Sequence, residues 1–209
     1  MTLTENPSTS AVPGGTDFAA ARRAMIDSQL RTSGVNEPFV LNAMNRVARE
    51  DHVPAAARSV AYMDRAVPLG DGHALPGPLF HGRALAEARP VASDRALVVD
   101  SGAGYLPALL SGIVQSVETI TPAQATAGRK PKGLGDFTLL MIDGAIEELP
   151  PMLGKLLADD ARIVTGLVER GVSRIAVGRA SGGKIALMRL AEMGIPRLAE
   201  FDREEAWSF

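Results

Sequence analysis

ALVVDSGAGY, residues 96–105, is the stretch that decides the fold of this chain. Its first half is a short apolar run, rich in β-branched residues, that ends at Asp100 and is followed by small residues. A run of this kind, bounded by turn residues, predicts a buried strand. From Tyr105 onward, YLPALLSGIV predicts a helix over 105–114. The stretch therefore predicts a strand, a tight turn and a helix, which is the repeating unit of a parallel α/β sheet.

The turn Ser101-Gly102-Ala103-Gly104 carries the sharpest local signal. Glycines let the backbone approach a ligand, and the free amides at a helix start attract anionic or polar groups. One interpretation is a nucleoside-cofactor site at the carboxyl edge of the sheet. The other is a tight turn in which glycine serves the backbone geometry alone, and the two glycines leave both open. The three-glycine dinucleotide pattern and the GxxxxGK(S/T) pattern do not occur, which disfavours nucleoside triphosphates.

Strand-like and helix-like runs alternate on the carboxyl side of this unit. We predict strands at 116–120, 137–143 and 161–168, a helix over 152–160, and a hairpin over 174–192 that turns at Ser181-Gly182-Gly183. Strands that alternate with helices indicate a parallel sheet. The predicted fold class is α/β, a doubly wound and mostly parallel sheet with an antiparallel hairpin at one edge.

On the amino side, two amphipathic helices are predicted before the sheet. The first begins at the N-cap Asp17 and ends at Gly34, and the second is capped by Asn36 with Pro38 in its first turn. The Pro- and Gly-rich stretch 51–80 predicts an ordered loop with short extended pieces. We expect residues 1–16 to be a disordered tail and residues 17–209 to form one domain, with the helices and loop at 17–92 and the sheet core at 93–209.

Composition narrows the function. The 209 residues contain 22 Lys and Arg, 24 Asp and Glu, three His and no Cys, so the net charge is −2. The sequence has no basic block for binding nucleic acid. Without cysteine it can form no disulfide, cysteine–zinc site or thiol nucleophile, and we expect no metal site. No apolar run approaches the ~18 residues that cross a bilayer. We expect a cytoplasmic protein with neither a nucleic-acid nor a membrane partner.

Five segments together are similar to the landmarks of a known family. They occur in the same order and at nearly the same spacing as in the protein-L-isoaspartate O-methyltransferases, over roughly residues 17–165. The segments are ARRAMIDSQLRTSGV (21–35), LNAMNRVAREDHVP (41–54), AYMDRAVPLGDG (61–72), DRALVVDSGAGYLPALL (94–110) and MIDGAIEELPP (141–151). The hairpin and the Phe-ended tail resemble a divergent bacterial branch of the family.

The resemblance implies the sheet of S-adenosylmethionine-dependent methyltransferases, with isoaspartyl-containing proteins or peptides as partners. A carboxylate of the substrate attacks the sulfonium methyl, so the protein contributes position and electrostatics and needs no covalent intermediate. Carried over onto this sequence, the cofactor-binding residues are Asp100, Ser101, Gly102, Ala103, Gly104 and Tyr105. The substrate-binding residues are His73, Leu75, Pro76, Gly77 and Pro78, and the candidate catalytic residue is Asp64.

Several departures from the family pattern fall on the cofactor site. Val98 stands at the family's acid and Asp100 at its first glycine. Asp100 either replaces the acid or blocks the space that the glycine left for the ligand. The expected ribose acceptor falls near Thr119–Ile120; Glu118 is one or two residues early, and an exposed charge is the other interpretation of it. The segment 121–136 is too short for a further strand and helix, so we predict that one edge strand is missing.

Departures also affect the substrate loop. Pro76 stands where the family has a serine beside the methyl-accepting carboxylate, and proline lacks both a hydroxyl and a backbone donor. His73 and His81 flank the loop, either as surface residues or as ligands of an acidic substrate. Asp64 is either catalytic or a cap that positions the loop.

Two hypotheses follow from the sequence. In the first, the chain is an active carboxyl methyltransferase of isoaspartyl residues that uses S-adenosylmethionine. In the second, it is a non-catalytic descendant that binds no cofactor tightly and acts as a binding or scaffold protein. Such a protein could form a homo-oligomer.

Overall fold

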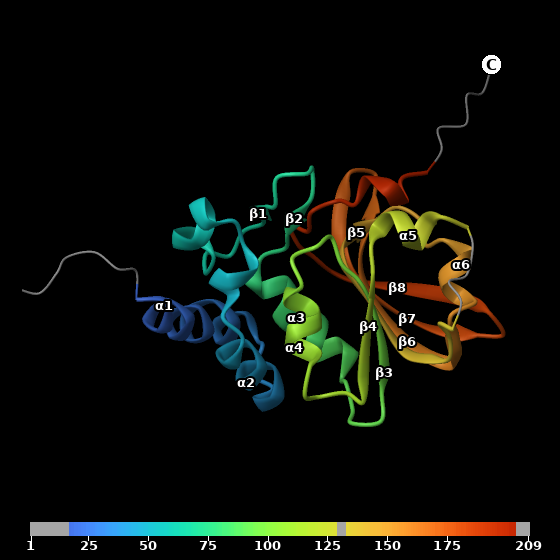
Figure 1. The fold of residues 1–209 in the computed structure, drawn as a ribbon, viewed down its shortest axis with the longest axis horizontal. Coiled ribbons are helices and arrows are strands. Elements are labelled where there is room, and N and C mark those ends of the chain that lie inside the picture. The colour runs from blue at the N-terminus through green and yellow to red at the C-terminus, as the bar shows by residue number, and fades with distance from the viewer. Residues whose placement is uncertain (1–16, 129–132, 204–209) are drawn as a thin grey trace, which may run out of the picture.

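The computed structural model describes residues 17–128 and 133–203, so the predicted tail 1–16 lies outside the described residues. Six strands form one sheet in the order β4-β3-β5-β6-β7-β8. Figure 1 shows this sheet on one side of the molecule and the amino-terminal helices on the other. The strand bounds are β3 Arg95–Val99, β4 Ser116–Ile120, β5 Phe137–Ile146, β6 Leu157–Glu169, β7 Val172–Ser181 and β8 Lys184–Glu192.

The pairing of these strands confirms the predicted fold class. β3 pairs in parallel with both β4 and β5, and β5 pairs in parallel with β6. β7 is antiparallel to both of its neighbours, so the β7–β8 hairpin closes one edge as predicted. At the other edge, no strand of residues 17–128 or 133–203 lies outside β4. This agrees with the predicted loss of an edge strand.

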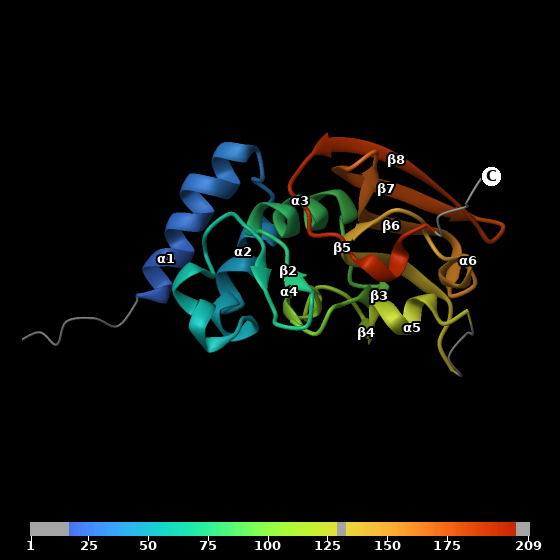
Figure 2. The same cartoon turned by 90° about the horizontal axis from the view of Figure 1, so that it is seen from above.

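A hydrophobic core fills the space on each face of the sheet. In β3, Ala96 and Val98 belong to one core, while Leu97 and Val99 belong to the other, because successive side chains of a strand alternate in direction. Figure 2 gives the view from above. Helices α3 (Pro78–Ala88) and α4 (Tyr105–Leu110) pack on the first core. Helices α5 (Pro122–Thr126) and α6 (Pro151–Gly154) pack on the second.

The two amino-terminal helices form much as the sequence predicts. α1 (Phe18–Met25) continues through a π-turn (Ile26–Leu30) and a 3-10 turn (Arg31–Ser33) to Gly34, whose φ of 83° ends the helix. Asp17 caps it by accepting a hydrogen bond from the Ala20 amide. The predicted cap of α2 (Pro38–Arg46) is wrong, because Glu37 and not Asn36 occupies that position and makes no side-chain cap bond there. Pro38 fixes the first turn instead.

The segment before α3 is an ordered loop region, as predicted, with two 3-10 turns (Arg49–His52 and Ala55–Val60). It also holds a two-stranded ribbon of β1 (Val67–Pro68) and β2 (Ala74–Leu75). Helix α3, however, begins at Pro78, so the predicted loop ends too late. Proline is favoured at the first position of a helix, and here it starts one.

Two helix lengths in the second half were predicted wrongly. α4 ends at Leu110, not at residue 114, and α6 spans Pro151–Gly154 only, not 152–160. A Cβ on Gly154 would lie 2.8 Å from the Gly183 carbonyl oxygen, so the hairpin turn packs directly on the end of α6. From Leu157 the chain pairs with Phe137 as β6. Long-range pairing therefore overrides the local helical pattern. A last 3-10 turn spans Ala199–Phe201, and no helix within 17–128 or 133–203 is long and apolar enough to cross a membrane.

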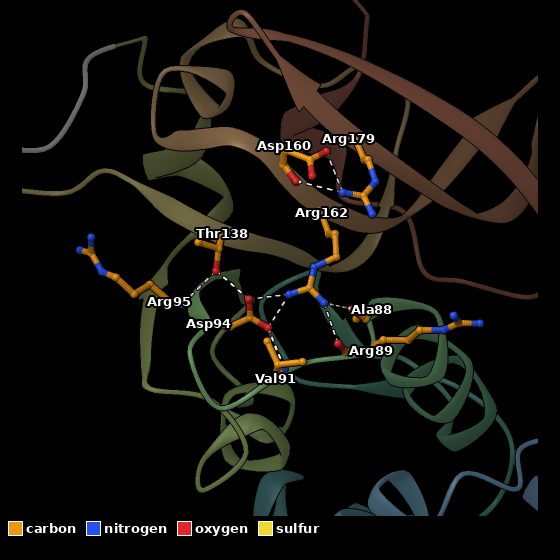
Figure 3. A network of polar contacts seen from close by, with 9 residues as sticks. All are labelled: Ala88, Arg89, Val91, Asp94, Arg95, Thr138, Asp160, Arg162 and Arg179. Carbon is orange, nitrogen blue, oxygen red and sulfur yellow. Dashed lines mark hydrogen bonds and ion pairs between the residues drawn. The ribbon is translucent and has the colours of Figure 1, made fainter.

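A polar network at the amino edge of the sheet holds helix α3 to the strands (Figure 3). The buried Asp94 carboxylate accepts hydrogen bonds from the Arg162 guanidinium, the Thr138 hydroxyl and the Val91 amide. Arg162 also donates to the carbonyl oxygens of residues 88 and 89, at the end of α3. Burial alone would raise the pKa of Asp94, but these donors lower it overall. The pair therefore stabilises the fold above about pH 4 and loses this effect as pH falls through the folded-state pKa.

We predict that Arg162→Met lowers the free energy of unfolding by about 2–3 kcal/mol at neutral pH, because it leaves the Asp94 carboxylate buried without its cation. The matched control is Arg179→Met on the adjacent strand. Arg179 pairs with Asp160, but both side chains are more than half exposed, at 61% and 76%. The control should cost less than about 0.5 kcal/mol. Urea unfolding measures both, and equal losses would contradict the role given to Asp94.

Candidate functional site

The predicted cofactor turn lies at the carboxyl end of β3, where the amino-terminal segments meet the sheet. Gly102 and Gly104 have φ values of 101° and 68°, which only glycine adopts without strain. Both of their amides donate to the Asp100 carboxylate, over 2.8 Å from Gly102 and 3.0 Å from Gly104. The amides predicted to face a ligand therefore bind an acid of the chain itself.

Asp100 is almost fully buried, with 4% of its surface exposed. Burial raises the pKa of its carboxyl group, and the negative charge of nearby Asp143 acts in the same direction. The two glycine amides oppose this rise. A buried carboxylate needs such donors, so the turn and Asp100 stabilise each other.

Arg49 is the centre of a second, wholly buried polar group. Its guanidinium donates to the carbonyl oxygens of Ala61 at 2.7 Å and Pro76 at 2.5 Å, and it contacts Nδ1 of His81 at 3.2 Å. It also lies 4.8 Å from the centre of the Tyr105 ring, in cation–π geometry. One side chain thus joins the 3-10 turn 49–52, the loop before α3, α3 itself and α4.

His81 connects this arginine to the sheet. Its Nε2 lies 2.8 Å from Oδ1 of Asp143, which is also buried and lies within β5. Arginine has only donors, so we assign Nδ1 of His81 as the acceptor and Nε2–H as the donor to Asp143. The interpretation of His81 as a surface residue of the loop is wrong, because it lies inside α3 with no exposed surface.

Tyr105 packs between two histidines at the start of α4. Its ring is 5.3 Å from that of His52 and 5.0 Å from that of His81, both in edge-on geometry. Burial raises the pKa of the Tyr105 phenol to about 12. Its hydroxyl oxygen and the Oγ of Ser101 are buried without a hydrogen-bond partner among the described residues. These two oxygens are unused polar groups beside the turn.

A cavity of about 320 Å³ opens beside the turn. This volume lies at the lower end of the range for small-molecule sites. A Cβ on Gly102 would meet nothing within 4 Å, so this part of the backbone borders open space. The lining comes from the 3-10 turn, the β1–β2 loop and the glycine turn: Asp51, His52, Val53, Pro54, Leu69, Asp71, Ser101, Gly102 and Ala103.

The predicted substrate residues lie in the loop that leads into α3. Leu75, Pro76, Gly77 and Pro78 are buried, and the Pro76 carbonyl is held by Arg49. Asp64 accepts a hydrogen bond from the Leu79 amide at 3.1 Å, in the first turn of α3. This contact is that of a helix cap, the structural alternative that the sequence left open.

His73 is the one predicted substrate residue that makes side-chain ion pairs. Its Nε2 lies 2.8 Å from Oε1 of Glu200 and its Nδ1 lies 3.2 Å from Oδ1 of Asp71. Burial alone would lower the pKa of His73, but the carboxylates of Glu200 and Asp71 beside its ring raise it overall. The β1–β2 loop is therefore tied to the 3-10 turn Ala199–Phe201 near the carboxyl end of the described chain.

The end of β4, where the family pattern places a ribose acceptor, carries no inward acid. Glu118 and Thr119 are exposed, and Ile120 is buried in the second core. The next residue, Thr121, is engaged in a capping box with Gln124 at the start of α5. The interpretation of Glu118 as an exposed charge is confirmed.

Sequence reasoning missed Arg49 and Asp143, although both carry signals. Asp143 ends the apolar run FTLLMID, and a polar residue directly after a buried strand falls at the carboxyl edge. Arg49 lies in the segment LNAMNRVAREDHVP. A neighbouring cluster was missed as well, in which Tyr62 and Arg22 both donate to Glu50.

The order of strands and helices defines the class of protein. The fold matches the crystal structure of a putative protein-L-isoaspartate O-methyltransferase from Plasmodium falciparum in complex with S-adenosyl-L-homocysteine, with a TM-score of 0.69. The match covers 89% of this chain and all of that one at 17% identity, so it speaks for the fold alone. The chain therefore has the α/β fold of this methyltransferase.

Sequence comparisons then give the family. Residues 20–127 match the model of the protein-L-isoaspartate(D-aspartate) O-methyltransferase family. A protein-L-isoaspartate O-methyltransferase of Koribacter versatilis is 30% identical, over 86% of this chain and 91% of the relative. Protein-L-isoaspartate O-methyltransferase 2 of Marinobacter nauticus is 32% identical, over 92% and 90%. The chain belongs to the protein-L-isoaspartate O-methyltransferase family.

We predict that Arg49→Lys lowers the free energy of unfolding by about 2–4 kcal/mol, because an ammonium group cannot reach the two carbonyls and His81 together. Arg46→Lys is the control, since Arg46 is exposed and, among the residues that the structure describes, its side chain donates only to the Ser111 carbonyl. It should change stability by less than about 0.5 kcal/mol. Denaturant unfolding at neutral pH compares them, and a mild effect at both positions would contradict the central role of Arg49.

We also predict a pH-dependent contribution from the contact between His73 and Glu200. The pKa of His73 is raised in the folded chain. Its stabilisation is therefore fully present below about pH 6.5 and is lost as pH rises through the folded-state pKa. Glu200→Gln should lower the free energy of unfolding by about 0.5–1 kcal/mol near pH 5.5 and by almost nothing near pH 8.5. A deficit that stays constant over this range would refute the linkage.

Proposed function

We propose that this chain is a family member whose cofactor turn has been closed by its own acid, so that it methylates isoaspartyl residues slowly or not at all and acts by binding. The observation that carries the proposal is the Asp100 carboxylate on the amides of Gly102 and Gly104. A family member that holds S-adenosylmethionine tightly needs this turn for the amino-acid part of the cofactor. Here the turn is already satisfied.

The residues around the turn fit the cofactor poorly in two further respects. Ile120 supplies no acceptor for ribose hydroxyls at the end of β4, and Glu118 points to solvent. In the described part of the chain β4 is also the edge strand. The further edge strand of the family, whose end commonly lines the adenine pocket, is therefore not present there. Hydrogen bonds to charged groups contribute ~1.5–3 kcal/mol each. Loss of two of them weakens binding roughly a hundredfold or more.

A second candidate function is retained carboxyl methylation with S-adenosylmethionine. It is favoured by family membership, by the open space beside Gly102, and by the unpartnered oxygens of Ser101 and Tyr105. In that case Ser101, Gly102 and Gly104 would hold the amino-acid part of the cofactor. The loop at 72–78 would receive the isoaspartyl peptide.

We predict that calorimetric titration with S-adenosylmethionine gives a dissociation constant near millimolar, against the micromolar value of a complete site. Asp100→Gly alone should not restore tight binding, because the ribose and adenine contacts are still absent. A radiolabelled methyl-transfer assay on an isoaspartyl peptide, with the aspartyl peptide as matched control, should give little or no product. A low-micromolar dissociation constant or rapid methylation of the isoaspartyl peptide would overturn the proposal in favour of the active enzyme.

A further inference from the structure

A second cavity, of about 770 Å³, opens where β5 and β6 end. Glu147 follows β5 directly, and Val168 and Glu169 are the last residues of β6. None of its lining residues lines the cavity beside the glycine turn, so the two are separate. Its volume is within the range of ligand sites. The rest of the lining comes from the β6–β7 turn, β7, β8 and the last described residue: Arg170, Val172, Arg174, Arg189, Leu190 and Arg203.

The charges of this lining are unequal. It contains four arginines, two glutamates and three apolar side chains. Both glutamates are already paired, Glu147 with Arg197 and Glu169 with Arg189, each at 2.9 Å. The charge left for a ligand to balance is therefore positive.

Arg170 carries the charge that is not balanced. It is exposed, lines the cavity and makes no ion pair within the described chain. With Gly171 it forms the two-residue turn between β6 and β7, with φ values of 52° and 77°. Turns of this kind favour Asn, Asp or Gly at the first position, so the turn geometry does not select an arginine.

Apolar side chains form the other part of the lining. Val172 is 37% exposed, and Val168 and Leu190 are at least partly buried beside it. An arginine fork binds a carboxylate, and exposed apolar surface favours an apolar group. The cavity therefore suits a ligand that carries both acids and apolar groups.

The described chain ends at this cavity. Arg203 lines it, and the Arg203 backbone amide donates to Oε2 of Glu147 at 3.0 Å. The Glu148 amide, in turn, donates to the Phe201 carbonyl at 3.2 Å. The backbone is thus held at the rim of the cavity where the described residues end. The sequence that follows is EEAWSF, residues 204–209, and six residues reach at most about 20 Å.

We propose that residues 204–209 bind in this cavity of their own chain. The two glutamates at the start of the segment bring the carboxylates that Arg170 lacks. Its Trp207 and Phe209 bring large apolar surface to the part of the lining around Val172. Acids and aromatics thus occur together in the segment, as the lining requires.

The covalent connection favours this occupant over a second copy or a separate peptide. A segment that begins at the rim has an effective concentration in the millimolar range at the cavity. A second copy or a peptide would have to reach a similar concentration in solution to compete. The contact does not depend on the glycine turn, so it holds whether or not the chain binds S-adenosylmethionine.

Tryptophan fluorescence of the full chain tests the proposal, because Trp207 is the single tryptophan of the sequence. Its emission should lie at shorter wavelength, and acrylamide should quench it less, than in the synthetic peptide EEAWSF. Arg170→Glu should lower the ratio of bound to released segment about tenfold, since a charge-assisted hydrogen bond is lost. Arg23→Glu is the matched control, because Arg23 is exposed on α1, outside the lining, and it should change neither quantity. Emission equal to that of the peptide, or an Arg170→Glu chain that behaves like the unchanged one, would overturn the proposal.

Methyl NMR gives a second readout that does not depend on charge reversal. Trp207→Leu removes the ring current of the indole, so the methyl resonances of Val172 and Leu190 should move. Those of Val91, which is 50% exposed in the turn before β3, should not move. The shifts should be the same at every protein concentration, because the contact lies within one chain. Unmoved Val172 methyls would refute the site, and shifts that appear only at high concentration would place the segment on another copy and refute the intramolecular contact.

Discussion

The buried guanidinium of Arg49 is the interaction on which the arrangement of the other parts depends. A charge removed from water must be hydrogen-bonded and balanced, or the fold does not tolerate it. Here the Ala61 and Pro76 carbonyls accept its protons, and Asp143 supplies the opposite charge through His81. These partners come from the amino-terminal segment, α3 and β5. The amino-terminal segments therefore dock in one position only, over the carboxyl edge of the sheet.

That docking also determines what the edge can do. The loop before α3 is held inward by Arg49, so the residues of its second half are buried. Beneath it, the negative charge of Asp143 lies close enough to Asp100 to add to the rise that burial gives the pKa of the Asp100 carboxyl group. Asp100 accepts hydrogen bonds from the glycine amides, and Asp143 contacts His81. The amides of Gly102 and Gly104 are thus hydrogen-bonded within the chain, while the Ser101 and Tyr105 oxygens have no partner among the described residues.

The sequence predicted those parts of the fold that depend on local patterns. Strands 116–120 and 137 onward begin where the period and the β-branched residues place them, and the two glycines after Ser181 mark the hairpin correctly. The helix predicted over 152–160 is wrong, because Leu157 pairs with Phe137 in the sheet and local propensity carries no information on such a distant contact. His81 was misplaced for the same reason: its burial follows from Arg49 and Asp143, which lie 32 and 62 positions away along the chain. The candidate site is built mainly of such distant contacts. The sequence therefore showed which residue types it contains but not which of them contact one another.

The two glycines of the turn after β3 are weak evidence for a ligand site. Gly102 and Gly104 adopt positive φ, so the backbone requires glycine there whether or not a ligand binds. Their presence reports only that the strand turns sharply into α4. What separates a ligand site from a closed turn is the partner of the two amide hydrogens, and that partner is set by the residue two positions before Gly102. With glycine at that position the amides would be free for a ligand. With Asp100 both amides are hydrogen-bonded within the chain, and the proposed loss of tight cofactor binding rests on this contact.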